Sequence, residues 1–159
     1  FCVNIGDDNT EGTIGPSDGK TYEGEIWIGT ADGNGNHATE GHAFASRPSS
    51  MSYWYKLDCF ESDPYYVEVK IYDKDGEVIG SAVKKDGASS VSSWTQVTLP
   101  INYTVTDKKA AKIYVVFKSS ASGKKSSRKY TLSRYDYGEG NVTIHAGNVL
   151  WLDEVKLNY

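Results

Sequence analysis

The stretch YYVEVKIYDKDGEVIGSAVK, residues 65–84, decides the fold class that we predict for this chain. In its first half, every second side chain belongs to one largely apolar set, which consists of Tyr65, Val67, Val69 and Ile71. Residues two apart share a face of a β-strand, so this pattern predicts a strand with one buried side. Asp75 and Gly76 then form a turn signal, and we expect both residues to adopt the positive φ angles of a tight hairpin.

The same alternation recurs between other turn signals. It predicts further strands within residues 20–30, 50–60, 94–101, 111–120 and 147–159. In the second of these ranges, one face carries Met51, Tyr53, Tyr55, Leu57 and Cys59, and the other carries Trp54, Lys56 and Asp58. Helical periodicity is almost absent. We therefore predict an all-β chain, folded as an antiparallel β-sandwich rather than as a parallel α/β sheet.

Length and charge limit the classes of protein that the chain can represent. Its 159 residues suit one domain, residues 1–159. The 17 basic and 21 acidic residues give a net charge of −4, which offers no positive field for nucleic acid or an anionic membrane. No apolar run is long enough to span a bilayer, so we expect no direct membrane insertion by this domain.

The chain begins at Phe1 and its one methionine is Met51, which predicts a processed protein or an excised domain. Whether Cys2 and Cys59 form a disulfide stays open, because the sequence gives no distance between them.

The closing stretch GNVLWLDEVKLNY, residues 147–159, contains a carboxylate at an unexpected position. Strand parity defines an apparent core face that would hold Val149, Trp151, Asp153, Val155, Leu157 and Tyr159. A buried carboxylate must be paired, metal-bound or neutralised. We expect that Asp153 accepts backbone N–H bonds or meets a cation such as Arg47. The alternative is a structural calcium ion, shared between Asp153 and the acidic segment GDDNTE at residues 6–11.

Two long connections interrupt the strands, at residues 30–41 and 120–147. Binding residues are often found on such loops, although a loop without a function is the commoner outcome. Within the second connection, residues 129–132 and 142–145 are predicted to form a short extra hairpin.

Carbohydrate binding requires aromatic rings outside the core, with polar groups beside them for the hydroxyls of the sugar. Parity places Trp54, Tyr66 and Tyr72 opposite the predicted core, whereas Trp27 alternates with isoleucines and cannot be placed. For each of these rings, simple coverage of the second side of a sheet is the alternative. With the loop residues included, the candidate ligand-binding residues are Tyr135, Tyr137, Trp27, Trp54 and Arg134.

Residues for catalysis are few. No serine lies in a GxSxG motif, and neither cysteine lies near a histidine signature, so we assign no catalytic residue. Glycoside hydrolysis needs only two carboxylates at a suitable separation, which a sequence cannot measure. We therefore expect no enzymatic activity, with a glycoside hydrolase as the enzymatic alternative.

Several stretches, taken in order, resemble one family. GHAFASRPSSMSYWYKL, residues 41–57, is similar to the signature Gly-x-x-Phe-x-x-Arg-Pro-x-x-Leu-x-x-x-Tyr-Lys of the Putative Carbohydrate Metabolism domain, the C-terminal module of many gut-bacterial surface and periplasmic proteins. The matching residues are Gly41, Phe44, Arg47, Pro48, Tyr55 and Lys56, with Met51 in place of leucine. The likeness continues through Trp94, the turn FKSSASG at 117–123 and the closing stretch, where Asn148 and Glu154 replace a serine and an aspartate. A related group of lipoprotein modules shares much of this pattern.

Over residues 41–159 the resemblance implies a jelly-roll β-sandwich similar to galactose-binding and carbohydrate-binding modules. It implies an exported bacterial protein, at the cell surface or in the periplasm and associated with the outer membrane, of which this is the C-terminal module. It also implies structural roles for Arg47, Trp94 and Asp153, the last two near the core, and in related modules an aspartate on the last strand helps to bind structural calcium. We expect a monomeric, non-catalytic module that binds a polysaccharide or another glycan, with a structural or adhesion module that contacts a partner protein as the alternative.

Overall fold

The computed structural model describes residues 2–6, 21–31, 37–38, 41–85, 88–122, 128–133 and 141–159. The strands are β1 (Cys2–Gly6), β2 (Thr21–Tyr22), β3 (Glu25–Ile28), β4 (Thr30–Ala31), β5 (His37–Ala38), β6 (His42–Ala43), β7 (Ser50–Asp58), β8 (Tyr66–Tyr72), β9 (Val78–Lys84), β10 (Val91–Pro100), β11 (Asn102–Tyr103), β12 (Lys112–Lys118), β13 (Arg128–Ser133) and β14 (Asn141–Asn158). These residues contain no helix, and hence no helix that could cross a membrane. The predicted all-β class is confirmed.

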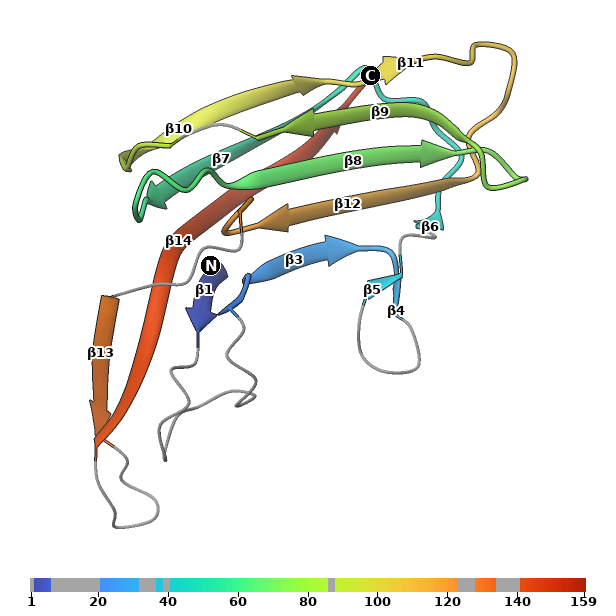
Figure 1. Ribbon diagram of the computed structural model, residues 1–159. Coiled ribbons are helices and arrows are strands. Elements are labelled where there is room, and N and C mark those ends of the chain that lie inside the picture. The colour runs from blue at the N-terminus through green and yellow to red at the C-terminus, as the bar shows by residue number, and fades with distance from the viewer. Residues whose placement is uncertain are drawn as a thin grey trace.

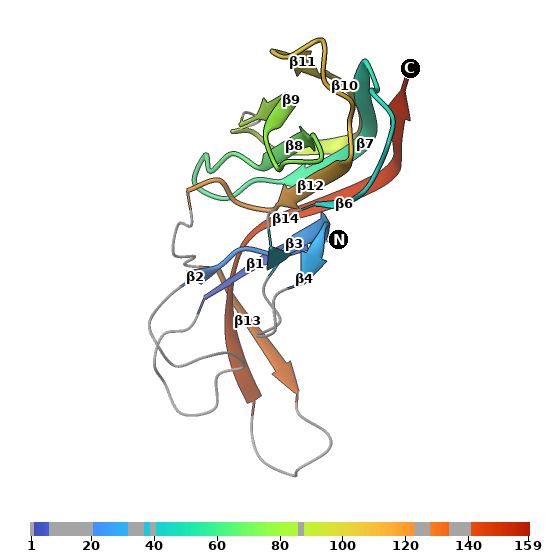
Figure 2. The same cartoon turned by 90° about the vertical axis from the view of Figure 1, so that its right-hand side faces the viewer.

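The strands form two main antiparallel sheets (Figure 1). The first sheet has the order β10-β7-β14-β1-β2, with β13 paired to β14, and the second has the order β11-β9-β8-β12-β3, with β6 paired to β12. The short strands β4 and β5 pair separately. Figure 2 shows that β13 and the beginning of β14 extend away from the two sheets as an arm. Their pairing, Arg128–Ser133 against 141–146, confirms the predicted extra hairpin.

Side chains from both sheets meet in one hydrophobic core. Tyr53 of β7 packs edge to face against Phe117 of β12, with ring centroids 5.2 Å apart, and its hydroxyl lies 3.1 Å from that of Tyr65. The four side chains predicted to face inward in β8 and just before it are fully buried, and so are most of the inward-facing residues of β7. Strand alternation therefore predicted the buried face of β8 and of β7 correctly.

The predicted hairpin between β8 and β9 is present, but its turn differs in one respect. Gly76 has a φ of 84°, whereas Asp75 does not have a positive φ. The reason is the buried carboxylate of Asp73, whose Oδ1 accepts the N–H groups of Asp75 and Glu77 at 2.9 and 2.8 Å. This side chain closes a longer turn in which only the glycine needs the left-handed region.

Strand β14 does not follow the parity that the sequence suggests. Leu150 is fully buried, and Leu152 packs against the same core, so the even-numbered side chains point inward in this part of the strand. Asp153 therefore lies on the outer face and is exposed. The prediction that Asp153 is buried is wrong.

A β-bulge explains the error. The register of β14 against β7 shifts between Asp153 and Lys156, and Glu154 adopts a φ of 46°. One extra residue reverses the side-chain alternation, so Leu157 returns to the core while Val155 is exposed. The carboxylate Oδ1 of Asp153 accepts the N–H of Glu154 at 2.8 Å, which supports this unusual backbone conformation.

A buried polar network holds one end of the sheets together. The side-chain amide of Asn148, at the middle of β14, donates to the carbonyls of Asp63 and Ser119 at 2.6 and 2.9 Å, and its oxygen accepts the N–H of Phe60 at 2.7 Å. The carboxylate of Asp63 in turn accepts the hydroxyls of Ser120 and Ser122. Buried polar groups are stable only when satisfied in this way, so the turn after β12 is fixed to both sheets.

Arg47 does not meet Asp153, contrary to one of our expectations. Its guanidinium donates to the carbonyls of Val105 at 2.7 Å and of Lys108, and it lies over the ring of Tyr103 at 4.2 Å from the centroid. Arg47, which lies shortly before the first residue of β7, therefore holds the connection between β11 and β12 in place.

The bulge makes a prediction about stability. Leu150→Ala should lower the free energy of unfolding by about 2–5 kcal/mol, because it empties a fully buried site. Asp153→Ala and Val155→Ala should each change it by less than about 1 kcal/mol, because both side chains are exposed. Denaturant unfolding of the three variants measures this. A large loss for Asp153→Ala with little for Leu150→Ala would mean that the faces are assigned in reverse.

Candidate functional site

Three of the chain's four tryptophans gather on the outer face of the first sheet. Trp54 lies on β7, Trp94 on β10 and Trp151 on β14, and these three strands are neighbours. We call the surface that they form with the polar side chains between them the tryptophan face, which consists of Trp54, Lys56, Trp94, Gln96, Trp151 and Asp153.

One row of this face runs across the strands with Lys56 at its centre. Lys56 is directly opposite Trp151 in the register of β14, and Trp94 lies on its other side. The ammonium Nζ is 4.7 Å from the centroid of the Trp94 ring and 5.8 Å from that of Trp151. These are cation–π distances, and in the described part of the chain no carboxylate forms an ion pair with this lysine. The ammonium group of Lys56 therefore lies near both indole rings.

The second row has the opposite composition, with an aromatic ring at its centre. Trp54 is paired with Gln96 of β10 on one side and with Asp153 of β14 on the other. Both polar side chains are exposed, and cross-strand neighbours are close enough to contact the ring between them. Aromatic and polar groups thus alternate both along β7 and across it.

The tryptophan face is accessible. Trp94 is 43 % exposed, while Trp54 and Trp151 are half-buried. Because adjacent strands are about 4.8 Å apart, the backbones at Trp94 and Trp151 are separated by roughly 10 Å. Large aromatic groups that are spread over this distance and remain in contact with solvent indicate a binding surface.

Irregular pairing occurs on both sides of β7 at this face. The register of β10 shifts between Val91 and Thr95, and that of β14 shifts between Asp153 and Lys156. Bulges re-aim side chains and are enriched next to functional sites. Here they place Trp94 and Asp153 beside the central strand. A shallow hollow of about 250 Å³ continues from the face, and its lining residues include Lys56, Asp58, Ser90, Ser92 and Trp151.

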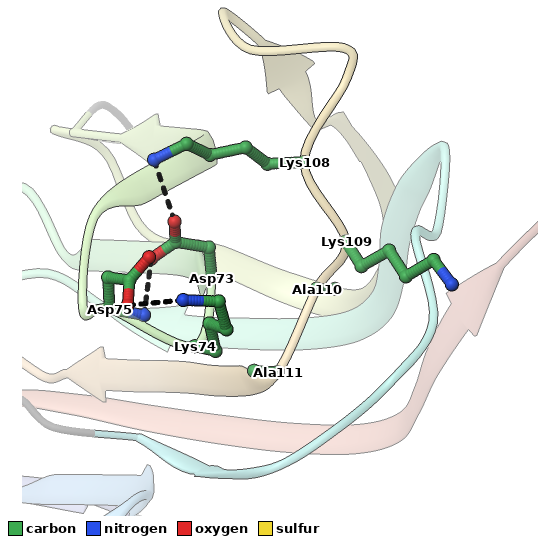
Figure 3. A pocket seen from close by; sticks show the side chains of 7 residues that line it. All are labelled: Asp73, Lys74, Asp75, Lys108, Lys109, Ala110 and Ala111. Carbon is green, nitrogen blue, oxygen red and sulfur yellow. Dashed lines mark hydrogen bonds and ion pairs between the residues drawn. The ribbon is translucent and has the colours of Figure 1, made fainter.

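The larger hollow at the β8–β9 turn is a less suitable site, as Figure 3 shows. It measures about 430 Å³, but Lys108 spans it to bind Asp73 at 2.9 Å and also Glu77. Lys74 pairs with Asp75 at 2.6 Å, and Lys109 points away from the Asp73–Lys108 pair. Most of its charged groups therefore bind one another and connect the turn to the β11–β12 connection.

The structure describes only some of the residues predicted to bind a ligand. Trp54 is at the centre of the tryptophan face, whereas Trp27 lies on the second sheet and packs beside Tyr114 and Val116. Arg134, Tyr135 and Tyr137 lie outside the described residues.

Trp94 was expected near the core, and this expectation is wrong. Its neighbours Val97 and Leu99 pack inward, so parity alone would have placed Trp94 outside. Sequence reasoning also missed Trp151, because the unseen bulge in β14 reversed the parity of the residues before it.

The calcium prediction loses its original reason, because Asp153 is exposed rather than buried. Among the described residues, no three His, Cys, Asp or Glu side chains are grouped as metal ligands would be. Nearly all of the acidic segment 6–11 lies outside those residues, so a shared ion stays a prediction.

The Cys2–Cys59 bridge is likewise untested, since the side chain of Cys2 is not described. The thiol of Cys59 donates to the carbonyl of Asp63 at 3.4 Å.

Comparison of the chain with protein-family models, with curated proteins and with solved structures gives no match. The resemblance to the Putative Carbohydrate Metabolism domain therefore stays a prediction that rests on the quoted motifs.

The Asp73–Lys108 pair makes stability depend on pH. The hydrogen bond from Lys108, supported by those from the backbone of Glu77 and Asp75, lowers the pKa of the Asp73 carboxyl below its ordinary value. A depressed pKa stabilises the fold above the unfolded-state value of about 3.9, and this contribution is lost as the pH falls through the folded-state pKa. Asp73→Asn should thus be less stable than the parent at pH 7 and should lose less stability on acidification. Urea unfolding from pH 7 to pH 2 measures this, with the exposed Asp75→Asn as control; parallel profiles for parent and Asp73→Asn would contradict it.

Proposed function

We propose that this chain is a non-catalytic carbohydrate-binding module and that the tryptophan face is its glycan site. The observation that carries the proposal is the alternation of three accessible tryptophans with lysine, glutamine and aspartate side chains on three adjacent strands. This pattern meets the requirement deduced from the sequence, which was for aromatic rings outside the core with polar groups beside them.

The chemistry of a sugar suits such a surface. A pyranose ring has faces of C–H groups, which pack against the flat apolar surface of an indole, and a rim of hydroxyls, which need hydrogen-bond partners. Lys56 can donate to these hydroxyls, Asp153 can accept from them, and the amide of Gln96 can do both. Every ring therefore has a polar group on the adjacent strand.

The charges of the face favour a neutral ligand. Lys56 and Asp153 carry opposite charges, so the face has no excess of one sign that would attract an acidic or a basic polymer. Its extent across three strands suits the interior of a polysaccharide chain rather than a small molecule enclosed on all sides.

We also propose that the two sheets form a jelly-roll β-sandwich. Two antiparallel sheets that share one core are compatible with a jelly-roll β-sandwich, the architecture that the family resemblance implies. We further propose that the module is monomeric and belongs to an exported bacterial protein at the cell surface or in the periplasm. The motifs between residues 41 and 159 support this placement.

Removal of the rings tests the proposal. Trp94→Ala and Trp151→Ala should each weaken binding to a neutral polysaccharide by about tenfold, which corresponds to the loss of ~1.4 kcal/mol from a central aromatic contact. Affinity electrophoresis in gels that contain one polysaccharide at a time, with a panel of neutral and acidic glycans, would measure the effect.

The matched control is Tyr159→Ala, which removes a 77 % exposed ring at the chain end outside the tryptophan face. It should bind as the parent does, and thermal melting should show that all variants are folded. If no polysaccharide in the panel retards the parent chain, the proposal is wrong, and the protein-contacting alternative would then account for the exposed tryptophans.

A further inference from the structure

A second aromatic surface lies on the outer face of the other sheet. Tyr66 of β8 and Tyr114 and Val116 of β12 point away from the core, because the residues that alternate with them, such as Val67 and Val115, are buried inside it. Val116 is fully buried and Tyr114 nearly so, although neither belongs to the main core. This face therefore has an apolar floor of its own.

The floor opens into a pocket of about 360 Å³, within the range of roughly 300–1,000 Å³ that is usual for small-molecule sites. Its lining consists of Glu23, Tyr66, Glu68, Tyr114, Val116, Lys118, Ser120 and Ala121. The two rings and the valine supply apolar surface, and Glu23, Glu68 and Lys118 supply polar groups, whereas the hydroxyl of Ser120 is buried and donates to Asp63.

Ion pairs on the strands largely balance the charges of the pocket. Glu68 binds Lys70 at 2.9 Å, and Lys118 binds Glu25. Burial raises the pKa of Tyr114 to about 12 and also raises that of Tyr66, so both phenols are neutral at physiological pH. A neutral ligand with many hydroxyls suits this combination better than a strongly charged one does.

The rim of the pocket is held in place before any ligand arrives. Gly24 donates to the hydroxyl of Ser119 at 3.0 Å and accepts the N–H of the same residue at 2.9 Å. The next residue, Ser120, donates to the buried carboxylate of Asp63, and Ala121 donates to the carbonyl of Pro64 at 2.7 Å. A preformed rim lowers the entropy cost of binding.

From these observations we infer that the pocket is a second carbohydrate site, which takes a single neutral sugar unit such as the end of a glycan chain. Its volume of about 360 Å³ suits one sugar unit better than a chain, and it does not depend on the tryptophan face for its geometry. Because the two sites lie on the outer faces of two different sheets, one module can hold two chains at once, and its avidity for a glycan matrix then exceeds its affinity for either chain.

NMR titration of the ¹⁵N-labelled chain tests the inference. The probes are glucose, galactose, mannose and N-acetylglucosamine, each raised to about 50 mM, well above the millimolar Kd of a weak site. We expect at least one of them to shift the backbone amides of Tyr66, Val116 and Ser120. Tyr66→Ala should weaken this response by about tenfold through loss of the ring wall, whereas Tyr66→Phe keeps the ring and should retain most of it.

Trp94→Ala separates this inference from the proposed function. It should reduce polysaccharide binding and leave the monosaccharide response of the pocket unchanged, while Tyr66→Ala should do the reverse. If no probe shifts the pocket amides, or if shifts occur only at the tryptophan face, the second site is wrong and the proposed function is unaffected. Parent-like dispersion of the amide resonances in each variant shows that it is folded.

Discussion

The alternation of side chains along β7 is the constraint on which the core and the candidate site both depend. The strand is the only direct neighbour of β10 among the described strands and pairs with β14 on its other edge. Its odd-numbered residues must be buried, since Met51 and Tyr53 are fully inaccessible to solvent. A period of two then forces Trp54 and Lys56 outward, however costly their exposure is. The same nine residues therefore stabilise the fold and supply the centre of the tryptophan face.

This coupling explains what could be predicted from sequence alone. In β8 and β7, where the extra residues of the irregular pairings lie on the partner strands, alternation identified both the buried side chains and the outward position of Trp54. The hairpin of β13 and the beginning of β14 was also predicted from the sequence, although not its extension away from the sheets. These features depend only on local periodicity, which can be read directly from the sequence.

The features that could not be predicted depend on contacts between distant residues. The sequence LWLDEVKL does not predict the positive φ of Glu154, because that conformation follows from the register of β14 against β7. The single extra residue moved Asp153 from the presumed core to the surface and moved Leu150 into the core. Likewise, the turn at Asp75 depends on where the carboxylate of Asp73 lies. In the second sheet, the pocket beside Tyr114 requires strands and loops that are distant in sequence.

The position of β10 has a consequence for solubility. It ends the first sheet among the described strands, so one side of its backbone has no strand partner there, close to an exposed tryptophan. A long, flat, apolar edge of this kind would template the addition of strands from other molecules. β10 is protected against this by its irregular pairing after Val91, by hydroxyl and amide side chains along much of its length, and by Pro100, which cannot donate a hydrogen bond, at its end. These features oppose the addition of strands at the edge that lies nearest to the exposed ring of Trp94.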